Sequence, residues 1–449
     1  MIPLSLGEIA QVTGGVVDGD PGVVVDAPAS LDSRRVEPGG LFAALAGERV
    51  DGHAFAAQAV ETGAAAVLGS RATGVPTVVV PDVTTALAAL ARHVLEQLDG
   101  VTVVALTGSS GKTSVKDLLA HLLAPDGATV ATVGNFNNEL GVPLTVLGVD
   151  ELTRYLVVEM GARHVGDITA LCAVARPDVG LVLNVGHAHV GEFGSVERIA
   201  EAKGEMAASI DADGVVVLNA DDPLVAAMAA RTEATVTTFG HAGDVALGDV
   251  SVDDHGFPHF SLTHHGRTVQ THVPLIGAYH AHNAAAAATA ALALGVDLPT
   301  IGQRLATAAA AVSPMRMERH ERADGLVVIN DAYNANPESM AAALRAVAAI
   351  GQGRAVAVLG AMLELGDDST AEHVRIGRLA AELGFARVVV VGDDAHGIAE
   401  GAGDIAVQVP DVDVATRTLS ASLSGGDVLL VKASRGVRLE RVAQALLGT

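Results

Sequence analysis

The sequence predicts an α/β protein of three domains, and three observations support this. Short, continuously apolar runs such as 101–106 (VTVVAL) and 388–391 (VVVV) are typical of strands buried on both faces of a parallel sheet. Stretches with apolar residues at helical spacing follow most of these runs. The pattern is interrupted near residue 100 and again near residue 313, which predicts domains at 1–99, 100–312 and 313–449.

The first domain is expected to be small and α/β. Short strands and helical stretches alternate through it, with dense turn signals such as EPGG at 37–40. The run 82–100 (DVTTALAALARHVLEQLDG) predicts a closing helix that ends at Gly100, and a new strand begins at Val101. We therefore place the first boundary there.

The second domain is predicted to contain a mostly parallel sheet. Buried strands are expected at 101–106, 155–160, 179–185 and 214–220. The segment 246–275 alternates polar and apolar residues between Gly turns, which predicts an antiparallel hairpin region.

The third domain is predicted to follow a polar linker at 313–325 (SPMRMERHERADG). After it, four apolar runs alternate with helical stretches: 326–331, 354–360, 386–392 and 427–433. This order predicts a second doubly wound sheet, Rossmann-like, with ligand loops at the carboxyl ends of its strands.

Composition excludes several classes of protein. The 449 residues carry a net charge of −24, which argues against non-specific nucleic-acid binding. No run of 18 apolar residues is present, so no membrane insertion is expected. The single cysteine, Cys172, permits no intramolecular disulfide, and the N-terminus lacks the pattern of an export signal. We therefore expect a cytoplasmic protein.

Residues 108–113 (GSSGKT) lie between a predicted strand and a predicted helix, the context of a phosphate-binding loop. Backbone N–H groups at such a helix N-terminus point at an anion, and the helix dipole adds to the attraction. Lys112 would reach the β- and γ-phosphates and the Thr113 hydroxyl would face Mg²⁺. The longer pattern has Gly where this chain has Leu106, and the short form occurs by chance more often. The alternative is a Gly-rich turn with a surface lysine.

Glu159 ends a buried strand, where a carboxylate is costly without a cation or a metal; a surface strand end is the alternative. His187 and His189 follow another buried strand and could be metal ligands or ordinary loop histidines, and their chemistry does not decide between the two.

Lys203 lies on a predicted helix among Glu197, Glu201 and Glu205. These charged neighbours alone favour a solvated helix face with salt bridges.

The segment 329–340 (INDAYNANPESM) follows an apolar strand and is rich in Asp and Asn. A loop of this composition at the carboxyl end of a strand is a candidate binding site. A purely structural loop is the alternative.

Taken together, these motifs resemble the Mur ligases of cell-wall synthesis, and within them the MurF type. The resemblance covers essentially the whole chain in order, through LDSRRVEPGGLFAALAGERVDGHAF, TGSSGKTS, GNFNNELGVPLT, EMGA, NVGHAHVGEFGS, AKGEM, DAYNANPESM, VLGAMLELGD and VKASRGVRLE. It implies a uridine-nucleotide-binding domain, a central ATPase domain and a C-terminal Rossmann-like domain that closes over ATP. The implied reaction joins D-Ala-D-Ala to UDP-N-acetylmuramoyl-tripeptide through an acyl phosphate, with ATP as the energy source.

The resemblance also implies roles for individual residues. Lys112, Glu159, His189 and Lys203 would be catalytic. Two Mg²⁺ ions would be held by Thr113, Glu159, His189 and Lys203, the last as a carbamate formed with CO₂, which reverses the preference for a solvated Lys203. ATP would contact Gly108, Ser109, Ser110, Gly111, Lys112, Thr113, Ser114, Asn283, Arg316 and Asp331. The muramoyl-peptide nucleotide would contact Ser33, Arg34, Asn138 and Thr145. Asn334 and Asn336 belong to a loop that would face ATP and the incoming dipeptide.

One segment departs from the family pattern G-x-H-N-x-x-N. Here residues 277–283 are GAYHAHN, so Tyr279 occupies the position of the usual His and His280 that of the first Asn.

Other functions fit less well. A sister ligase that adds a single amino acid would carry D-N-P-R in the last domain, and a folylpolyglutamate synthase would lack the N-terminal pattern. A switch GTPase would need N-K-x-D. A non-catalytic relative would be expected to lose Lys112, Glu159 or Lys203. We expect a monomer.

Overall fold

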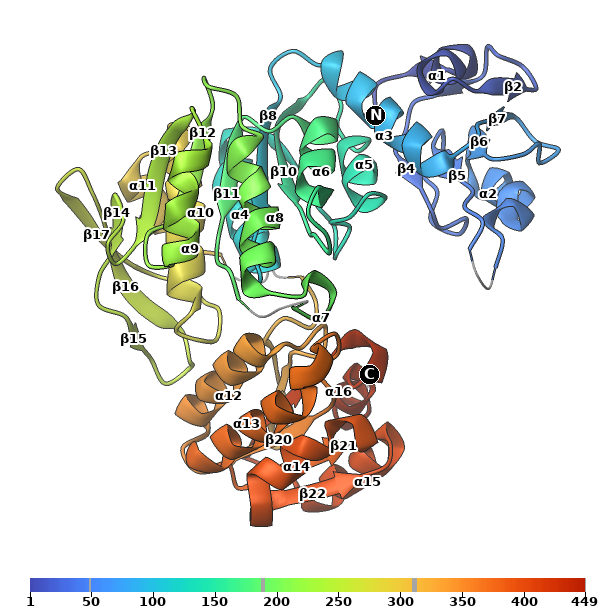
Figure 1. The fold of residues 1–449 in the computed structure, drawn as a ribbon. Helices are drawn as coiled ribbons and strands as arrows, with labels where there is room; N and C mark the ends of the chain where they lie inside the picture. Colours follow the sequence, from blue (N-terminus) through green and yellow to red (C-terminus); the bar gives the residue numbers. More distant parts are fainter. Residues whose placement is uncertain (48–49, 187–189, 309–312, 449) are drawn as a thin grey trace.

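The computed structural model describes residues 1–47, 50–186, 190–308 and 313–448 (Figure 1). It is a mixed α/β structure with three main sheets that follow one another along the chain. In Figure 1 the central sheet has the N-terminal part, in blue, beside it and the C-terminal part, in orange and red, below it. Among the described residues, no helix has the length and apolar composition needed to cross a membrane.

The N-terminal part is built on a five-stranded sheet of order β2-β7-β6-β5-β4, in which only β2 is antiparallel to its neighbour. Its strands are β2 (Val16–Asp18), β4 (Ala29–Ser30), β5 (Leu41–Ala43), β6 (Ala66–Gly69) and β7 (Thr77–Val79), and β1 (Leu4–Ser5) pairs separately with β3 (Val24–Val25). Its helices are α1 (Leu6–Thr13), α2 (Ala56–Thr62) and α3 (Val83–Glu96). The closing helix is confirmed as α3, although it ends at Glu96 and not at Gly100. Asp82 caps its start by accepting a hydrogen bond from the Thr85 N–H.

The central sheet has the order β15-β16-β14-β13-β12-β11-β8-β10-β9, with β17 paired to β16. Its parallel strands are β8 (Thr102–Thr107), β9 (Ala128–Ala131), β10 (Thr153–Glu159), β11 (Val179–Val182), β12 (Val215–Asn219), β13 (Thr235–Gly240) and β14 (Val245–Leu247). The predicted hairpin region is confirmed: β15 (Ser251–Val252), β16 (Pro258–His264) and β17 (Arg267–His272) are antiparallel.

Helices cover both faces of the central sheet, as its continuously apolar strands require. One face packs on α4 (Lys112–Leu123), α10 (His280–Ala293) and α11 (Leu298–Ala306). The other packs on α5 (Gly141–Val146), α6 (Asp167–Ala175) and α8 (Val196–Ala208), and its core continues into α3 of the N-terminal part. Two short helices, α7 (Val190–Phe193) and α9 (Pro223–Ala226), lie in the loops.

The C-terminal sheet has the order β18-β19-β23-β20-β21-β22. Its strands are β18 (Glu318–Glu321), β19 (Val327–Asn330), β20 (Ala355–Leu359), β21 (Arg387–Val391), β22 (Ala406–Val409) and β23 (Val428–Lys432). Helices α12 (Pro337–Gly351), α13 (Ser369–Glu382) and α14 (His396–Ala402) cover one face, and α15 (Val412–Ser422) and α16 (Glu440–Leu447) cover the other. The predicted doubly wound arrangement is confirmed.

The prediction of a simple linker at 313–325 is wrong for its middle. Residues 318–321 form the edge strand β18, antiparallel to β19. An edge strand needs only one hydrogen-bonded neighbour and one covered face, so the polar sequence ERHE forms a strand without an apolar run.

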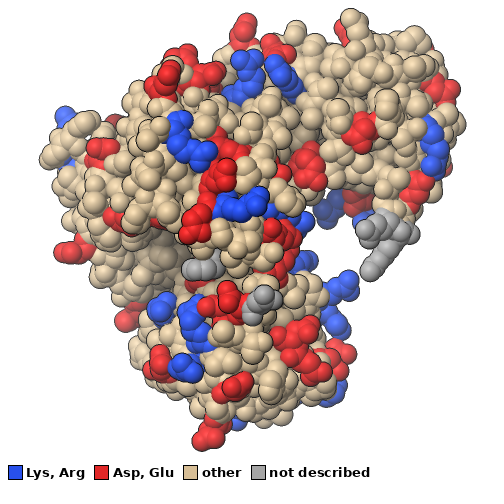
Figure 2. All heavy atoms as spheres, in the orientation of Figure 1, with Lys and Arg blue, Asp and Glu red and all other residues tan. Residues whose placement is uncertain are grey.

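Acidic and basic side chains are interspersed over the face of the molecule shown in Figure 2. That face also has an open notch between the N-terminal and C-terminal parts.

Candidate active site

The predicted phosphate-binding loop connects β8 to α4. Gly111 has φ of 82°, in the left-handed region that favours glycine, and α4 starts at the next residue. A Cβ atom on Gly111 would stand 2.6 Å from Oδ1 of Asn283, so Asn283 lies directly against the loop. The structure thus brings together two parts of the predicted nucleotide site that are 172 positions apart in sequence.

A side chain that the sequence analysis did not single out holds this loop. Asn184, just after β11, accepts hydrogen bonds from the Ser109 N–H through its backbone oxygen (3.1 Å) and from the Ser110 N–H through its side chain (2.9 Å). Because β11 neighbours β8, a polar residue at the end of this buried strand was a usable signal.

Lys112 is half-buried and folds back over the loop. Its Nζ donates a hydrogen bond to the backbone oxygen of Gly108 at 2.8 Å. Loss of solvation lowers its pKa, the nearby Glu159 carboxylate acts in the opposite direction, and the Arg316 guanidinium lowers it further. The lysine therefore lies where a phosphate group could take the place of the Gly108 carbonyl as its partner. The alternative of an ordinary surface lysine is wrong.

Glu159 is only 2% exposed, so the alternative of a surface strand end is wrong. Its carboxylate accepts hydrogen bonds from the Thr113 hydroxyl (2.9 Å) and from the Asn137 amide (2.7 Å). Arg316 donates to the same Thr113 hydroxyl at 3.1 Å. An acidic group, a hydroxyl and a guanidinium from three distant segments thus meet beside the loop.

Lys203 is buried on α8, 4% exposed, and not on a solvated face. The expectation from its charged neighbours alone is wrong because Lys203 shares its helix face with Ile199, Ala202 and Met206, which pack inward. Glu205 is buried as well, and it accepts hydrogen bonds from the backbone N–H groups of Gly166 and Thr169 instead.

Loss of solvation lowers the pKa of Lys203 well below its usual range, and the positive charge of Lys112 lowers it further. No hydrogen bond or ion pair joins the Lys203 side chain to another residue within the described ranges. His187 and His189 lie outside the described residues, so the predicted role of His189 gains no structural account.

The C-terminal sheet presents a second group of polar residues. Asp331, buried just after β19, accepts hydrogen bonds from Lys432 Nζ (2.6 Å) and from the Met317 N–H (3.1 Å). Lys432 also donates to the backbone oxygen of Asn334 at 2.8 Å. Lys432 was not among the predicted residues, although a lysine that ends the apolar run DVLLVK was a visible signal.

The segment around Tyr333 connects the two sheets. The guanidinium of Arg316 lies 4.1 Å from the Tyr333 ring centroid, a cation–π contact. Asn334 is exposed, while Asn336 caps α12 by accepting a hydrogen bond from the Ser339 N–H at 2.8 Å. Asn336 therefore has a structural function in addition to any contact with a ligand.

The altered segment at 277–283 also reaches the C-terminal sheet. His280 is buried, which lowers its pKa to about 3, and its Nδ1 lies 3.3 Å from Nδ2 of Asn283. Tyr279 packs on His280 with ring centroids 4.3 Å apart and joins the apolar cluster of the C-terminal part. Burial raises the pKa of Tyr279, and the charge of Asp331 adds to this, so the ring lies near that carboxylate.

The four residues predicted to bind the muramoyl-peptide nucleotide form their side-chain hydrogen bonds with residues outside the loop at 108–114. The Ser33 hydroxyl donates to Gln58 at 3.1 Å, and the exposed Arg34 pairs with Asp32. Asn138 accepts a hydrogen bond from the Gly141 N–H, and Thr145 donates to the Gly141 backbone oxygen. Asn138 follows Asn137, the residue bound to Glu159, so this segment connects the predicted substrate region to the site.

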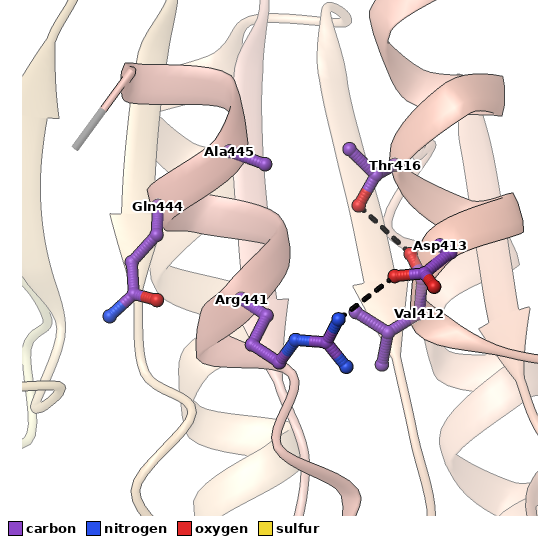
Figure 3. A pocket seen from close by; sticks show the side chains of 6 residues that line it. All are labelled: Val412, Asp413, Thr416, Arg441, Gln444 and Ala445. Carbon is purple, nitrogen blue, oxygen red and sulfur yellow. Dashed lines mark hydrogen bonds and ion pairs between the residues drawn. The ribbon is translucent and has the colours of Figure 1, made fainter.

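A separate hollow of about 340 Å³ lies between α15 and α16 (Figure 3). Asp413 and Arg441 form an ion pair across it, with Nη2 and Oδ1 3.0 Å apart. It contains none of the predicted site residues.

Comparison with known proteins agrees with this arrangement. Three family models match in order: "Mur ligase family, catalytic domain" at residues 29–97, "Mur ligase middle domain" at 106–291, and "Mur ligase, glutamate ligase domain" at 315–435. The UDP-N-acetylmuramoyl-tripeptide–D-alanyl-D-alanine ligase of Mycobacterium tuberculosis is 46% identical over 100% of this chain and 98% of its own. The enzyme of that name from Escherichia coli is 36% identical over 99% of both chains.

Solved structures give the same result. MurF from Acinetobacter baumannii superposes with a TM-score of 0.89 and 33% identity, covering 100% of this chain and 99% of that one. MurF from Thermotoga maritima, in complex with ADP, gives a TM-score of 0.80 with 32% identity over 94% and 97% of the two chains. Similarity at these levels, over nearly the full length of both proteins, establishes that the chain belongs to the Mur ligase family and, within it, to the MurF type.

Proposed function

We propose that the chain ligates D-Ala-D-Ala to UDP-N-acetylmuramoyl-tripeptide and converts ATP to ADP and phosphate. The observation that carries this proposal is the assembly of Lys112, Thr113, Glu159 and Arg316 beside a phosphate-binding loop, in a chain similar over its full length to ligases named for this reaction.

ATP would lie along the loop at 108–114. The N–H groups at the start of α4 and the Lys112 ammonium would face its phosphates. Asn283, against Gly111, would face the base. Arg316 and the Asp331–Lys432 pair would approach from the C-terminal sheet.

The donor set fits Mg²⁺, which prefers oxygen ligands and keeps several waters. The Thr113 hydroxyl and the Glu159 carboxylate are 2.9 Å apart and offer such oxygens, and Asn137 orients the carboxylate. A bound Mg²⁺ would offset negative charge on the phosphates. We propose two such ions, with His189 and modified Lys203 as further ligands.

Lys203 is suited to reaction with CO₂. A depressed pKa leaves a larger fraction of the amine neutral, and the neutral nitrogen can attack the carbon of CO₂ and lose a proton to give a carbamate. The modification would replace the repulsion between Lys203 and Lys112 with attraction.

In the reaction, the terminal carboxylate of the tripeptide attacks the γ-phosphate and ADP leaves. The amine of D-Ala-D-Ala attacks the resulting acyl phosphate, and the tetrahedral intermediate expels phosphate. Lys112 and Arg316 would offset the repulsion between carboxylate and triphosphate as charge develops on the transferred group. Closure of the C-terminal part over the site would exclude water, which would otherwise hydrolyse the acyl phosphate.

Ser33, Arg34, Asn138 and Thr145 would contact the muramoyl-peptide nucleotide, and Asn334 and Asn336 the dipeptide. The proposed domains remain 1–99, 100–312 and 313–449. A monomer in the cytoplasm, where ATP is supplied, is part of the same proposal.

The direct test is phosphate release from ATP with UDP-N-acetylmuramoyl-tripeptide, with and without D-Ala-D-Ala, and the product mass. We expect release that depends on the dipeptide and a product heavier by one D-Ala-D-Ala less water. Turnover with a single amino acid and a shorter precursor, but none with the dipeptide, would instead identify a ligase for another step.

The proposed role of Lys203 predicts that Lys203→Ala loses most of its activity at ambient CO₂. Lys203→Arg, which keeps a cation but cannot form this carbamate, should be equally inactive. Carbon-13 NMR of wild-type protein with labelled bicarbonate should show a carbamate signal that both variants lack. Full activity in either variant would remove the carbamate from the mechanism.

A further inference from the structure

Three side chains outside the proposed active site converge at the carboxyl edge of the central sheet. Asp221 follows β12, His241 follows the neighbouring strand β13, and His282 lies in the first turn of α10. One potential ligand atom from each lies within 4.8 Å of the others. The sequence analysis singled out none of the three as a ligand, because 20 and 41 positions separate them along the chain.

The spacing of these atoms suits one metal ion. Nε2 of His282 is 3.3 Å from Oδ2 of Asp221. Two ligands of a tetrahedral Zn²⁺, each about 2.0–2.2 Å from the metal, are roughly 3.4 Å apart. The ligand atoms of Asp221 and His282 therefore need to move little to bind one metal ion. The ring nitrogen of His241 needs only to move toward the same ion.

The third ligand is already oriented. His241 Nδ1 lies 2.9 Å from the backbone oxygen of Leu247, and because a carbonyl only accepts, Nδ1 must carry the proton. The lone pair is then on Nε2, the free ring nitrogen. A hydrogen bond from the second ring nitrogen to a carbonyl is the usual support for a metal-binding histidine.

Hydrogen bonds also hold the Asp221 carboxylate in place. Asp221 accepts hydrogen bonds from the backbone N–H groups of His241 (2.8 Å) and Ala242 (3.2 Å). The Asp221 and His282 side chains are 24% and 38% exposed, so an ion can reach them from solvent.

We propose that Asp221, His241 and His282 form a binding site for a transition-metal dication of the Zn²⁺ class, with a fourth position open to water. Two imidazoles with one carboxylate favour Zn²⁺ and its neighbours over Mg²⁺, which prefers oxygen ligands. The site is separate from the oxygen ligands at Thr113 and Glu159, and it does not depend on the proposed ligase activity. It is connected to the phosphate-binding loop through Asn283, the residue after His282, which lies against Gly111.

The test uses the full chain without a histidine tag, in buffer containing millimolar Mg²⁺. Zn²⁺ is titrated in competition with a chromophoric chelator, and Co²⁺ is added separately to record its visible absorption spectrum. We expect one strongly bound Zn²⁺ per chain and a Co²⁺ spectrum typical of tetrahedral coordination. His282→Ala and His241→Ala should each weaken Zn²⁺ binding at least about tenfold.

His259→Ala is the matched control. His259 also faces an aspartate, with Nε2 3.0 Å from Oδ2 of Asp253, but it lies outside this three-residue cluster. It should bind Zn²⁺ like the wild type.

Absence of saturable Zn²⁺ binding in the wild type would overturn the proposal, as would equal affinities in the His282 and His259 variants. Either result would leave Asp221, His241 and His282 as a hydrogen-bonded cluster that ties two loops to α10. Because Asp221 also holds backbone N–H groups, thermal unfolding of each variant is measured first. Should His282→Ala fail to fold, Asp221→Asn replaces it and should lower the affinity by at least the same factor.

Discussion

Buried ionisable side chains gather where the central and C-terminal sheets face each other. Glu159, Lys203, Asp331 and Lys432 are all at most 7% exposed. Burying a charge is costly unless a partner compensates. Asp331 and Lys432 compensate one another at 2.6 Å, whereas Lys203 experiences a like charge from Lys112. A buried lysine whose pKa is lowered by burial and by a like charge is an arrangement found at functional sites, which supports the role proposed for Lys203.

His280 gives a prediction about pH. Its pKa falls to about 3 in the folded chain, whereas an unfolded histidine titrates near 6.5. Between these values the unfolded chain binds more protons, so stability is full above pH 6.5 and is lost as the pH falls. By pH 5 the free energy of unfolding should be about 2 kcal/mol lower on account of His280.

The check is urea unfolding of wild type and His280→Asn at pH 7.5 and pH 5.0. The carboxylates titrate in both proteins, so the difference between the two losses isolates His280. Equal losses would mean that His280 is protonated or exposed in the folded protein.

At the scale of elements, the proposed ligand-binding side chains lie at strand ends and helix starts. The loop at 108–113 joins β8 to α4, Glu159 ends β10, Asn184 follows β11, and Asp331 follows β19. The carboxyl ends of parallel strands meet at one edge of a sheet, so residues distant in sequence become neighbours there.

Helix α12 offers a test that separates structure from ligand binding. Asn336 and Ser339 form a capping box at its start. Asn336→Ala should therefore lower the free energy of unfolding by about 1 kcal/mol, whereas Asn336→Asp, an equally good cap, should keep it. If the Asn336 amide also contacts the dipeptide, the Asp variant should raise the KM for D-Ala-D-Ala without loss of stability.

Asp297 provides the control for this test. It caps α11, also followed by a proline in the first turn, and it accepts a hydrogen bond from the Thr300 N–H. Asp297→Ala should cost similar stability and leave the KM unchanged. A normal KM in Asn336→Asp would confine Asn336 to its capping role.

At the scale of the whole molecule, the three parts differ in whether each has a hydrophobic core of its own. The C-terminal sheet has its own helices and a core on each face. The N-terminal part instead shares one continuous core with the central part, because α3 packs on α5 and α6. Ile276 and Tyr279 of the central part pack into the apolar cluster of the C-terminal part and join the two.

This difference predicts how fragments behave. The fragment 313–449 should unfold cooperatively in urea by circular dichroism, since its core is nearly complete. The fragment 100–449 lacks α3 and exposes the apolar faces of α5 and α6, so it should bind a hydrophobic dye and unfold at lower urea than the full chain. Equal stability of the fragment 100–449 and the full chain would show that the first boundary is a true domain limit.

The sequence by itself determined the fold class, most of the order of strands and helices, the strand–loop–helix arrangement around residues 108–113 and, through resemblance, the family. These follow from local patterns: apolar runs, helical spacing, caps and glycine turns. The tertiary structure alone decided which side chains are buried and paired. Lys203 on α8 appeared solvated from its charged neighbours, and the edge strand β18 appeared to be a linker, because burial depends on what packs against an element. Asn184, Lys432 and the Asp221–His241–His282 cluster likewise needed the sheets, since contacts between distant segments are formed only by the packing of the folded chain.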